Sequence, residues 1–207
     1  MVDFNVSEFF RGSLTFVVVG EIVLLELCRW HTGEQVRMWS TGCGEGEEPY
    51  SVAILLRELI LKNTTLEPLI VATDVDLDAL EKARKAEYEG KALQEVKKVS
   101  LDQYFRQKGE KYVLSEGIRK MVHFVYHDIT NGTIPREGLF SSYRLVLCRN
   151  VIIYLKREIA GRVFRIVSRS LFPRGYLVLG ETEVLPEDVV TEYREVIPRS
   201  NVFQKMR

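Results

Sequence analysis

The sequence lacks an excess of charge of either sign. It has 207 residues, and its 29 Lys and Arg residues balance its 29 Asp and Glu residues. A neutral chain generates no overall field that would attract nucleic acid or an anionic membrane surface. We therefore expect no nucleic-acid partner. A chain of this length suffices for one domain with a sizeable core.

Cysteine is also scarce. Cys28, Cys43 and Cys148 are odd in number and widely spaced, which argues against a disulfide framework. No two of them have the spacing of zinc ligands, and His123 and His127 have no acid at ligand spacing, so the sequence predicts no metal site. So few cysteines favour the reducing cytosol, and we expect a cytoplasmic protein.

The chain has no long hydrophobic run either. The longest apolar stretch, residues 14–28, contains a glycine and two glutamates and is too short to span a bilayer comfortably. Asp3 and Glu8 precede it, whereas a signal peptide would begin with basic residues. We interpret the stretch as a buried helix and expect no insertion into a membrane.

The sequence contains neither the G-x-G-x-x-G motif of dinucleotide-binding folds nor the G-x-x-x-x-G-K-[ST] motif of P-loops. Instead, an extended apolar segment at 37–40 leads into Gly42-x-Gly44-x-Gly46, which is followed by Glu47 and Glu48. Glycines between a strand and a helix let a ligand approach the backbone closely. Two glutamates would repel a phosphate but attract a cation. The loop therefore favours S-adenosylmethionine, which has a sulfonium and an α-amino group, over a dinucleotide.

Strand patterns alternate with helix patterns along the chain, which predicts a mostly parallel sheet with covered faces. Residues 89–121 are rich in Lys, Glu and Gln, and we interpret them as an inserted subdomain. Pro173-Arg174-Gly175 is predicted to be a turn, and two short strand-like runs near the C-terminus predict an antiparallel hairpin. The predicted strands are 37–40, 69–73, 123–126, 144–148 and 176–179, the tail runs are 189–196 and 201–204, and the helices are 14–28, 48–62, 76–88 and 156–171.

Polar side chains follow several of these strands, at the edge where ligands bind in such sheets. Asp74 can accept hydrogen bonds from ribose hydroxyls, while Asp76 is expected to cap the next helix. Asp128 and Ile129 could hold an adenine edge and face. A plain turn is the alternative for both Asp74 and Asp128. Cys148-Arg149-Asn150-Val151-Ile152-Ile153-Tyr154 returns polar groups to the same edge, and its cysteine is interpreted as a buried, inert thiol.

With these residues in view, the chain resembles the catalytic domain of the CheR-type chemotaxis receptor methyltransferases. The resemblance covers nearly the whole chain in the family's order. Its motifs are Asn5-Val6-Ser7-Glu8-Phe9-Phe10-Arg11, Trp39-Ser40-x-Gly42-Cys43, Gly46-Glu47-Glu48-Pro49-Tyr50-Ser51, Ala72-Thr73-Asp74-Val75-Asp76, Cys148-Arg149-Asn150-Val151-Ile152-Ile153-Tyr154 and Gly175-Tyr176-Leu177-Val178-Leu179-Gly180.

This resemblance implies a fold and a set of roles. The fold would be the Rossmann-like α/β fold of class I methyltransferases, with a mostly parallel seven-stranded sheet, an antiparallel C-terminal hairpin and a small inserted β-subdomain. The implied roles are Asn5, Ser7 and Arg11 over the cofactor, Gly42 in the loop, Glu48 at the α-amino group, Asp74 at the ribose, Asp128 and Ile129 at the adenine, Arg149 and Asn150 at the methionine half, and Arg11 and Tyr154 in catalysis.

The resemblance also implies an activity. The chain would transfer a methyl group from S-adenosylmethionine to glutamates in the cytoplasmic domain of methyl-accepting chemotaxis receptors, leaving S-adenosylhomocysteine. We expect a monomer, without the helical domain that usually precedes this region. Two alternatives stay open. The chain could be a methyltransferase that acts on another substrate, or it could be a non-catalytic module that senses S-adenosylmethionine and binds receptors. A nicotinamide oxidoreductase is opposed by the acidic loop.

Overall fold

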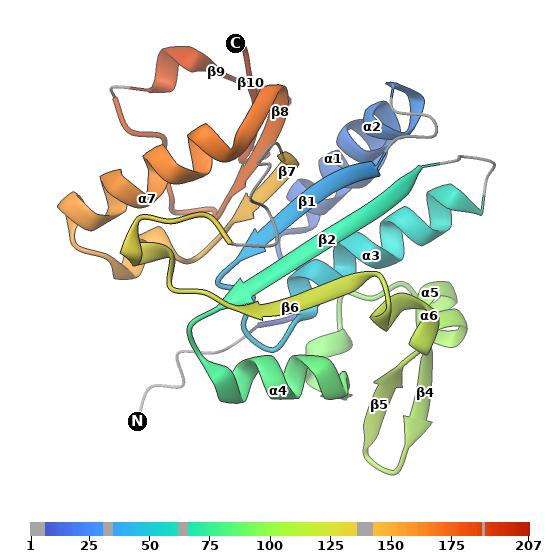
Figure 1. Ribbon diagram of the computed structural model, residues 1–207. Coiled ribbons are helices and arrows are strands. Elements are labelled where there is room, and N and C mark those ends of the chain that lie inside the picture. The colour runs from blue at the N-terminus through green and yellow to red at the C-terminus, as the bar shows by residue number, and fades with distance from the viewer. Residues whose placement is uncertain (1–6, 31–34, 62–65, 136–142, 188) are drawn as a thin grey trace.

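A seven-stranded sheet forms the centre of the molecule (Figure 1). The computed structural model describes residues 7–30, 35–61, 66–135, 143–187 and 189–207. The strand order is β6-β2-β1-β7-β8-β10-β9, in which the first five strands are parallel and β10 is antiparallel to β8 and β9. The strands are β1 Gln35–Thr41, β2 Glu67–Asp74, β6 Val122–Tyr126, β7 Tyr143–Cys148, β8 Leu171–Leu179, β9 Tyr193–Glu195 and β10 Val202–Lys205. The predicted fold class is confirmed.

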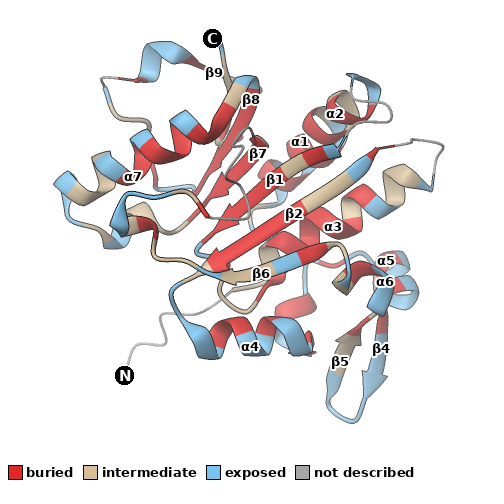
Figure 2. Ribbon diagram, in the orientation of Figure 1, coloured by how far each residue is buried: buried red, intermediate tan, exposed pale blue. Residues whose placement is uncertain are grey.

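Two hydrophobic cores cover the two faces of this sheet. Neighbouring residues of a strand point to opposite faces, and so Met38 belongs to one core and Trp39 to the other. The central strands are accordingly buried along most of their length (Figure 2). This explains why their sequences are continuously apolar rather than alternating.

Helices supply the other half of each core. The first core includes α3 (Glu47–Ile60) and a continuous helix formed by α1 (Ser13–Val18), the π-helical turn η1 (Val19–Leu24) and α2 (Leu25–Trp30). The second core includes α7 (Arg157–Ser170). The buried helix predicted over 14–28 is confirmed, although no sequence pattern indicated its π-helical turn. Within the described part of the chain, no helix is long and apolar enough to cross a membrane.

A second, three-stranded antiparallel sheet lies between α4 (Leu77–Lys85) and β6, in the order β3-β5-β4. Its strands are β3 Glu87–Glu89, β4 Phe105–Lys108 and β5 Lys111–Leu114, and the short helices η2 (Gly90–Leu93), α5 (Lys98–Tyr104) and α6 (Glu116–Arg119) accompany them. The N-terminal arm packs on this unit, since the Phe9 ring makes edge contacts with Tyr88 and Phe105 and the Phe9 N–H donates to the Ala92 carbonyl at 2.9 Å.

Three predicted elements differ from the structure. In the tail run expected to be strand-like at 189–196, strand β9 begins only at Tyr193, because the Val190 N–H donates to the Pro186 carbonyl and the Glu192 N–H to the Val189 carbonyl, which forms the short helix η6 (Val190–Glu192). The helix expected to reach Tyr88 ends at Lys85, because Ala86 adopts a left-handed conformation and Tyr88 then pairs with Tyr112 in the small sheet. The turn expected at 173–175 lies inside β8, where the pairing with β7 shifts register. Arg174 has a φ of 64° there and its guanidinium lies over the Trp30 ring. The residues form an irregularity in the strand rather than its beginning.

Candidate functional site

The loop between β1 and α3 is shaped by its three glycines. Gly42, Gly44 and Gly46 all have positive φ, at 60°, 54° and 95°, a region in which glycine is the only unstrained residue. A Cβ on Gly42 would lie 2.5 Å from a Val151 methyl, and one on Gly46 would lie 3.0 Å from the Ala83 Cβ. A Cβ on Gly44 would meet nothing within 4 Å. Two glycines are therefore required by packing, whereas the third faces open space.

Asp74, the last residue of β2, ties this loop to the neighbouring strand. One carboxylate oxygen accepts from the Gly44 N–H at 2.8 Å and the other accepts from the Asp76 N–H at 2.9 Å. Asp74 is half-buried, and a carboxylate with two hydrogen bonds retains capacity for more. Asp76 caps α4 by accepting from the N–H groups of Asp78 and Ala79, as predicted. Ribose binding by Asp74 stays a prediction.

A mostly buried ion pair links the first turn of α3 to the end of β7. Glu48 accepts from the Ser40 hydroxyl at 2.8 Å and from the Arg149 guanidinium at 3.3 Å. The Arg149 side chain is only 4% exposed and also donates to the Arg11 carbonyl at 2.7 Å. Burial raises the pKa of Glu48, and Arg149 and Ser40 oppose that shift by stabilising the carboxylate.

One buried N–H group of Arg149 is not used by the ion pair. The Arg149 Nε has no hydrogen-bond partner among the described residues, and a buried unsatisfied N–H of a charged group is costly. A ligand carboxylate at this point would satisfy it, while Glu48 would attract an ammonium group. Arg149 and Glu48 together therefore fit the amino-acid half of S-adenosylmethionine.

The N-terminal arm reaches the same region. The Phe10 N–H donates to the Ser51 hydroxyl of α3 at 2.9 Å. Ser7 hydrogen-bonds the Glu47 carboxylate, and the Arg11 side chain is exposed. The structure thus brings Ser7 to Glu47, directly after the glycine loop, and the Arg11 carbonyl to Arg149, whereas Asn5 lies outside the described residues.

Asp128 and Ile129 follow β6 at the same edge of the sheet. The Asp128 carboxylate caps the short helix η3 (Ile129–Asn131), accepting from the Thr130 N–H at 2.9 Å and from the Thr130 hydroxyl at 2.6 Å. Ile129 is buried in the core that contains Trp39. Asp128 therefore makes the turn that was its alternative reading, and adenine binding by these two residues stays a prediction.

The segment after β7 carries Asn150 and Tyr154. Asn150 has a φ of 56°, and Tyr154 lies in the short helix η5 (Ile152–Tyr154) with 61% of its surface exposed. The sequence analysis missed Glu183, whose carboxylate accepts hydrogen bonds from the backbone of this segment. Its signal was weak, because Glu183 is one of several acids in the tail.

The thiols near the site are not nucleophiles. Burial raises the pKa of Cys148, whose sulfur lies 3.8 Å from the Thr41 hydroxyl. Burial and the neighbouring carboxylates of Asp74 and Glu48 raise the pKa of Cys43. A thiol is reactive as the thiolate, so both stay protonated and inert at neutral pH.

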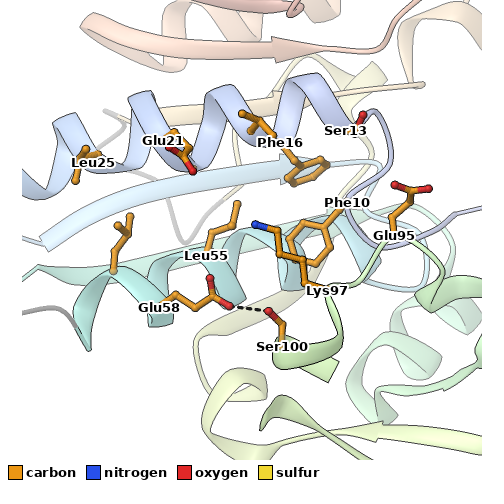
Figure 3. A pocket seen from close by; sticks show the side chains of 13 residues that line it. Phe10, Ser13, Phe16, Glu21, Leu25, Leu55, Glu58, Glu95, Lys97 and Ser100 are labelled. Carbon is orange, nitrogen blue, oxygen red and sulfur yellow. Dashed lines mark hydrogen bonds between the residues drawn. The ribbon is translucent and has the colours of Figure 1, made fainter. Parts of the chain in front are cut away.

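A cavity of about 520 Å³ lies beside the helix 13–30 (Figure 3). It is lined by the helix 13–30, by α3 and by the segment leading into α5, where Glu58 accepts from the Ser100 hydroxyl at 2.8 Å. Two of its lining residues lie near predicted site residues, because Phe10 precedes Arg11 and the Phe16 ring centroid lies 5.4 Å from the guanidinium carbon of Arg149. A second cavity, of about 420 Å³, is lined in part by Gly12, Glu181 and Arg199. It adjoins the site, because a Cβ on Gly12 would lie 3.1 Å from the Arg149 guanidinium.

Comparison with known proteins gives a consistent result. The family model described as "CheR methyltransferase, SAM binding domain" matches residues 5–200. Chemotaxis protein methyltransferase 1 of Pseudomonas aeruginosa is 31% identical over 87% of this chain, and chemotaxis protein methyltransferase Cher2 of Pseudomonas putida is 30% identical over 87%. The chain spans about two thirds of the length of these curated relatives, 66% in each case.

A solved structure supports the fold. The crystal structure of DszA carbon methyltransferase superimposes with a TM-score of 0.51 at 19% identity, over 82% of this chain and 36% of that one. At this identity the likeness concerns the fold alone. It agrees with a sheet whose ligand edge lies at the carboxyl ends of the parallel strands.

Proposed function

The chain belongs to the CheR methyltransferase family, and we propose that it methylates glutamate side chains in the cytoplasmic domain of methyl-accepting chemotaxis receptors, with S-adenosylmethionine as the methyl donor. The observation that carries the proposal is the convergence of an acid-rimmed glycine loop, Asp74 and the buried Glu48–Arg149 pair on one edge of the sheet. A cationic nucleoside with an amino-acid tail suits these groups, whereas a pyrophosphate does not.

Each part of the cofactor has an assigned group. Glu48 would hold the α-amino group and Asp74 the ribose hydroxyls. The Arg149 Nε, which has no hydrogen-bond partner in the described part of the chain, would hold the carboxylate. Asp128 and Ile129 would lie at the adenine. When bound, S-adenosylmethionine supplies an electrophilic methyl group that a glutamate carboxylate can accept, leaving S-adenosylhomocysteine and a methyl ester.

The acceptor needs alignment more than deprotonation. A glutamate with a pKa near 4.3 is already ionised at neutral pH, so no strong general base is required. Arg11 would steer the carboxylate, and the Tyr154 phenol would donate to the oxygen that does not attack. Correct orientation can contribute several of the roughly 7–11 kcal/mol available from ideal positioning. We expect Arg11→Ala to lower turnover more than cofactor affinity.

Two further features belong to the proposal. Residues 1–207 would form one methyltransferase domain with an insertion at 89–121, supported by the second sheet between α4 and β6. The neutral net charge supports a protein partner rather than nucleic acid, and the few cysteines support a cytoplasmic location.

Calorimetry with S-adenosylhomocysteine tests the cofactor site. We expect micromolar binding to the wild type and no measurable binding to Asp74→Ala. Asp78→Ala is the matched control, since Asp78 is an exposed acid at the start of α4. Undiminished binding to Asp74→Ala would remove the ribose assignment.

Incubation with a donor labelled in its methyl group and with receptor cytoplasmic fragments tests the acceptor. Methyl esters hydrolyse in base, so we expect a label on the receptor that is released by mild alkali. A label stable to alkali would show that another kind of atom is methylated. Tight cofactor binding without transfer to any receptor would favour the non-catalytic alternative.

A further inference from the structure

Five backbone N–H groups converge on the carboxylate of Glu183. One oxygen accepts from Val151 at 2.9 Å, from Ile152 at 2.8 Å and, more weakly, from Ile153 at 3.4 Å. The other accepts from Asn150 at 3.0 Å and from Gly180 at 2.8 Å. Glu183 is only 5% exposed. Successive N–H groups of this kind form an anion-binding concavity, and here the chain's own carboxylate fills it.

The carboxylate joins two loops that leave neighbouring strands. Asn150–Ile153 follows β7, whereas Gly180 follows β8, which lies beside β7 in the sheet. The two loops are closely apposed, because a Cβ on Gly180 would lie 2.9 Å from a Glu183 oxygen and 3.0 Å from the Asn150 nitrogen. Glycine at 180 is therefore required for the carboxylate to reach both loops.

The first of these loops carries proposed site residues. Asn150 has a φ of 56°, a left-handed conformation that asparagine adopts more readily than most other non-glycine residues. Arg149 precedes it, and Tyr154 follows the last N–H that donates to Glu183. Tyr154 and Val184 are exposed, at 61% and 81%, so the joined loops present side chains to solvent where an acceptor would approach.

We propose that Glu183 is a positioning residue for methyl transfer, which fixes the loop after β7 so that Tyr154 meets the acceptor carboxylate. This inference rests on the proposed function. Glu183 would touch neither cofactor nor acceptor and would act through the loop backbone.

Of the residues assigned to the cofactor, Asn150 alone donates to Glu183 in the described structure, and Glu48 and Asp74 are held by other contacts. Ser40 of β1 holds Glu48, and the Gly44 and Asp76 N–H groups hold Asp74 at the end of β2. Loss of the hydrogen bonds to Glu183, here called the Glu183 clamp, should therefore affect the acceptor side of the site and not the cofactor side. Cofactor affinity should be largely retained, while alignment of the acceptor is lost.

The test is Glu183→Gln, which keeps the size of the side chain but places an NH₂ group against N–H donors. Misplacement of a reacting group by about 1 Å can lower a rate by about 100-fold. We expect kcat to fall by about 100-fold, with S-adenosylhomocysteine affinity within about threefold of the wild type. Amide hydrogen exchange should show lost protection at 150–153. Glu187→Gln, the same change at an exposed position four residues along, should leave all three measurements unchanged.

A double-mutant cycle shows whether the effect passes through Tyr154. In a Tyr154→Phe background, Glu183→Gln should lower kcat by less than about threefold further, because the group that it positions is already absent. Multiplicative losses would overturn the role assigned to Tyr154 and with it the proposal.

Other outcomes also decide the question. Unchanged kcat in Glu183→Gln, or equal losses of kcat, cofactor affinity and melting temperature, would overturn the positioning role. If Glu183→Gln does not fold, Gly180→Ala places a Cβ against the Glu183 carboxylate without removing its charge. This variant should also lower kcat while retaining S-adenosylhomocysteine affinity. A wild type inactive on receptors would refute the proposed function, whereas retained exchange protection in Glu183→Gln would refute the clamp.

Discussion

Glu47, in the first turn of α3, should reduce the stability of the protein at neutral and alkaline pH. Its side chain is buried, with the residue 4% exposed, and one carboxylate oxygen has no hydrogen-bond partner among the described residues. Burial raises the pKa of Glu47 from 4.5 to about 7, and the Ser7 hydrogen bond only partly opposes it. The folded protein therefore binds this proton more tightly than the unfolded chain does.

The sign of the effect follows from this difference. Below pH 4.5 Glu47 is protonated in both states and costs nothing. As pH rises from 4.5 to 7, the unfolded chain loses the proton first, so the free energy of unfolding falls, and above pH 7 the loss is complete. Each pH unit between the two pKa values corresponds to about 1.4 kcal/mol, which gives a total of about 3 kcal/mol.

Glu47→Gln removes the titration while keeping the shape. Relative to the wild type, the variant should be more stable by about 1 kcal/mol at pH 5 and by about 3 kcal/mol at pH 8. Urea unfolding at pH 5, 6, 7 and 8 measures the difference, and the melting temperature at pH 8 should rise by about 6–12 °C. Glu81→Gln is the control, because Glu81 is exposed on α4. A difference between Glu47→Gln and the wild type that does not change with pH would refute the reasoning.

Three further predictions concern the site. Gly42→Ala should abolish S-adenosylhomocysteine binding in calorimetry, since its Cβ would overlap a side chain at 2.5 Å, whereas Gly44→Ala, in open space, should cost only about 1 kcal/mol of backbone strain in urea unfolding. Arg149→Met should lower the free energy of unfolding at pH 7 by about 3–5 kcal/mol, because it leaves Glu48 as an uncompensated buried charge; a loss below 1 kcal/mol would contradict this. Asp76→Ala should cost about 1 kcal/mol in the same assay, through loss of the α4 cap, with cofactor affinity retained.

Local patterns predicted most of the elements correctly. The period of the apolar residues indicated α3 and α7, and their observed bounds differ from the prediction by one or two residues. Asp76 was recognised as a cap because capping involves residues only two or three positions apart. The glycine loop was recognised for the same reason, since its strand, glycines and helix are contiguous in the sequence.

The errors arose where distant segments decide the local conformation. Helix α4 ends three residues before the predicted end because Tyr88 pairs with Tyr112 in the small sheet, and alanine at 86 carries no signal for a left-handed conformation. The predicted turn at 173–175 is an irregularity inside β8, produced by its pairing with β7. Proline and glycine indicate a break in regular structure, but only the neighbouring strand determines its form.

The sequence by itself determined the alternation of strands and helices and the acidic character of the glycine loop, because these depend on residues a few positions apart. Only the tertiary structure decided which polar groups meet. Glu48 and Arg149 are separated by 101 residues, and Glu183 reaches a loop about 30 residues before it. Parallel pairing of β1 with β7 and of β7 with β8 brings their carboxyl ends to one edge, and that pairing depends on packing of the whole sheet rather than on any local pattern.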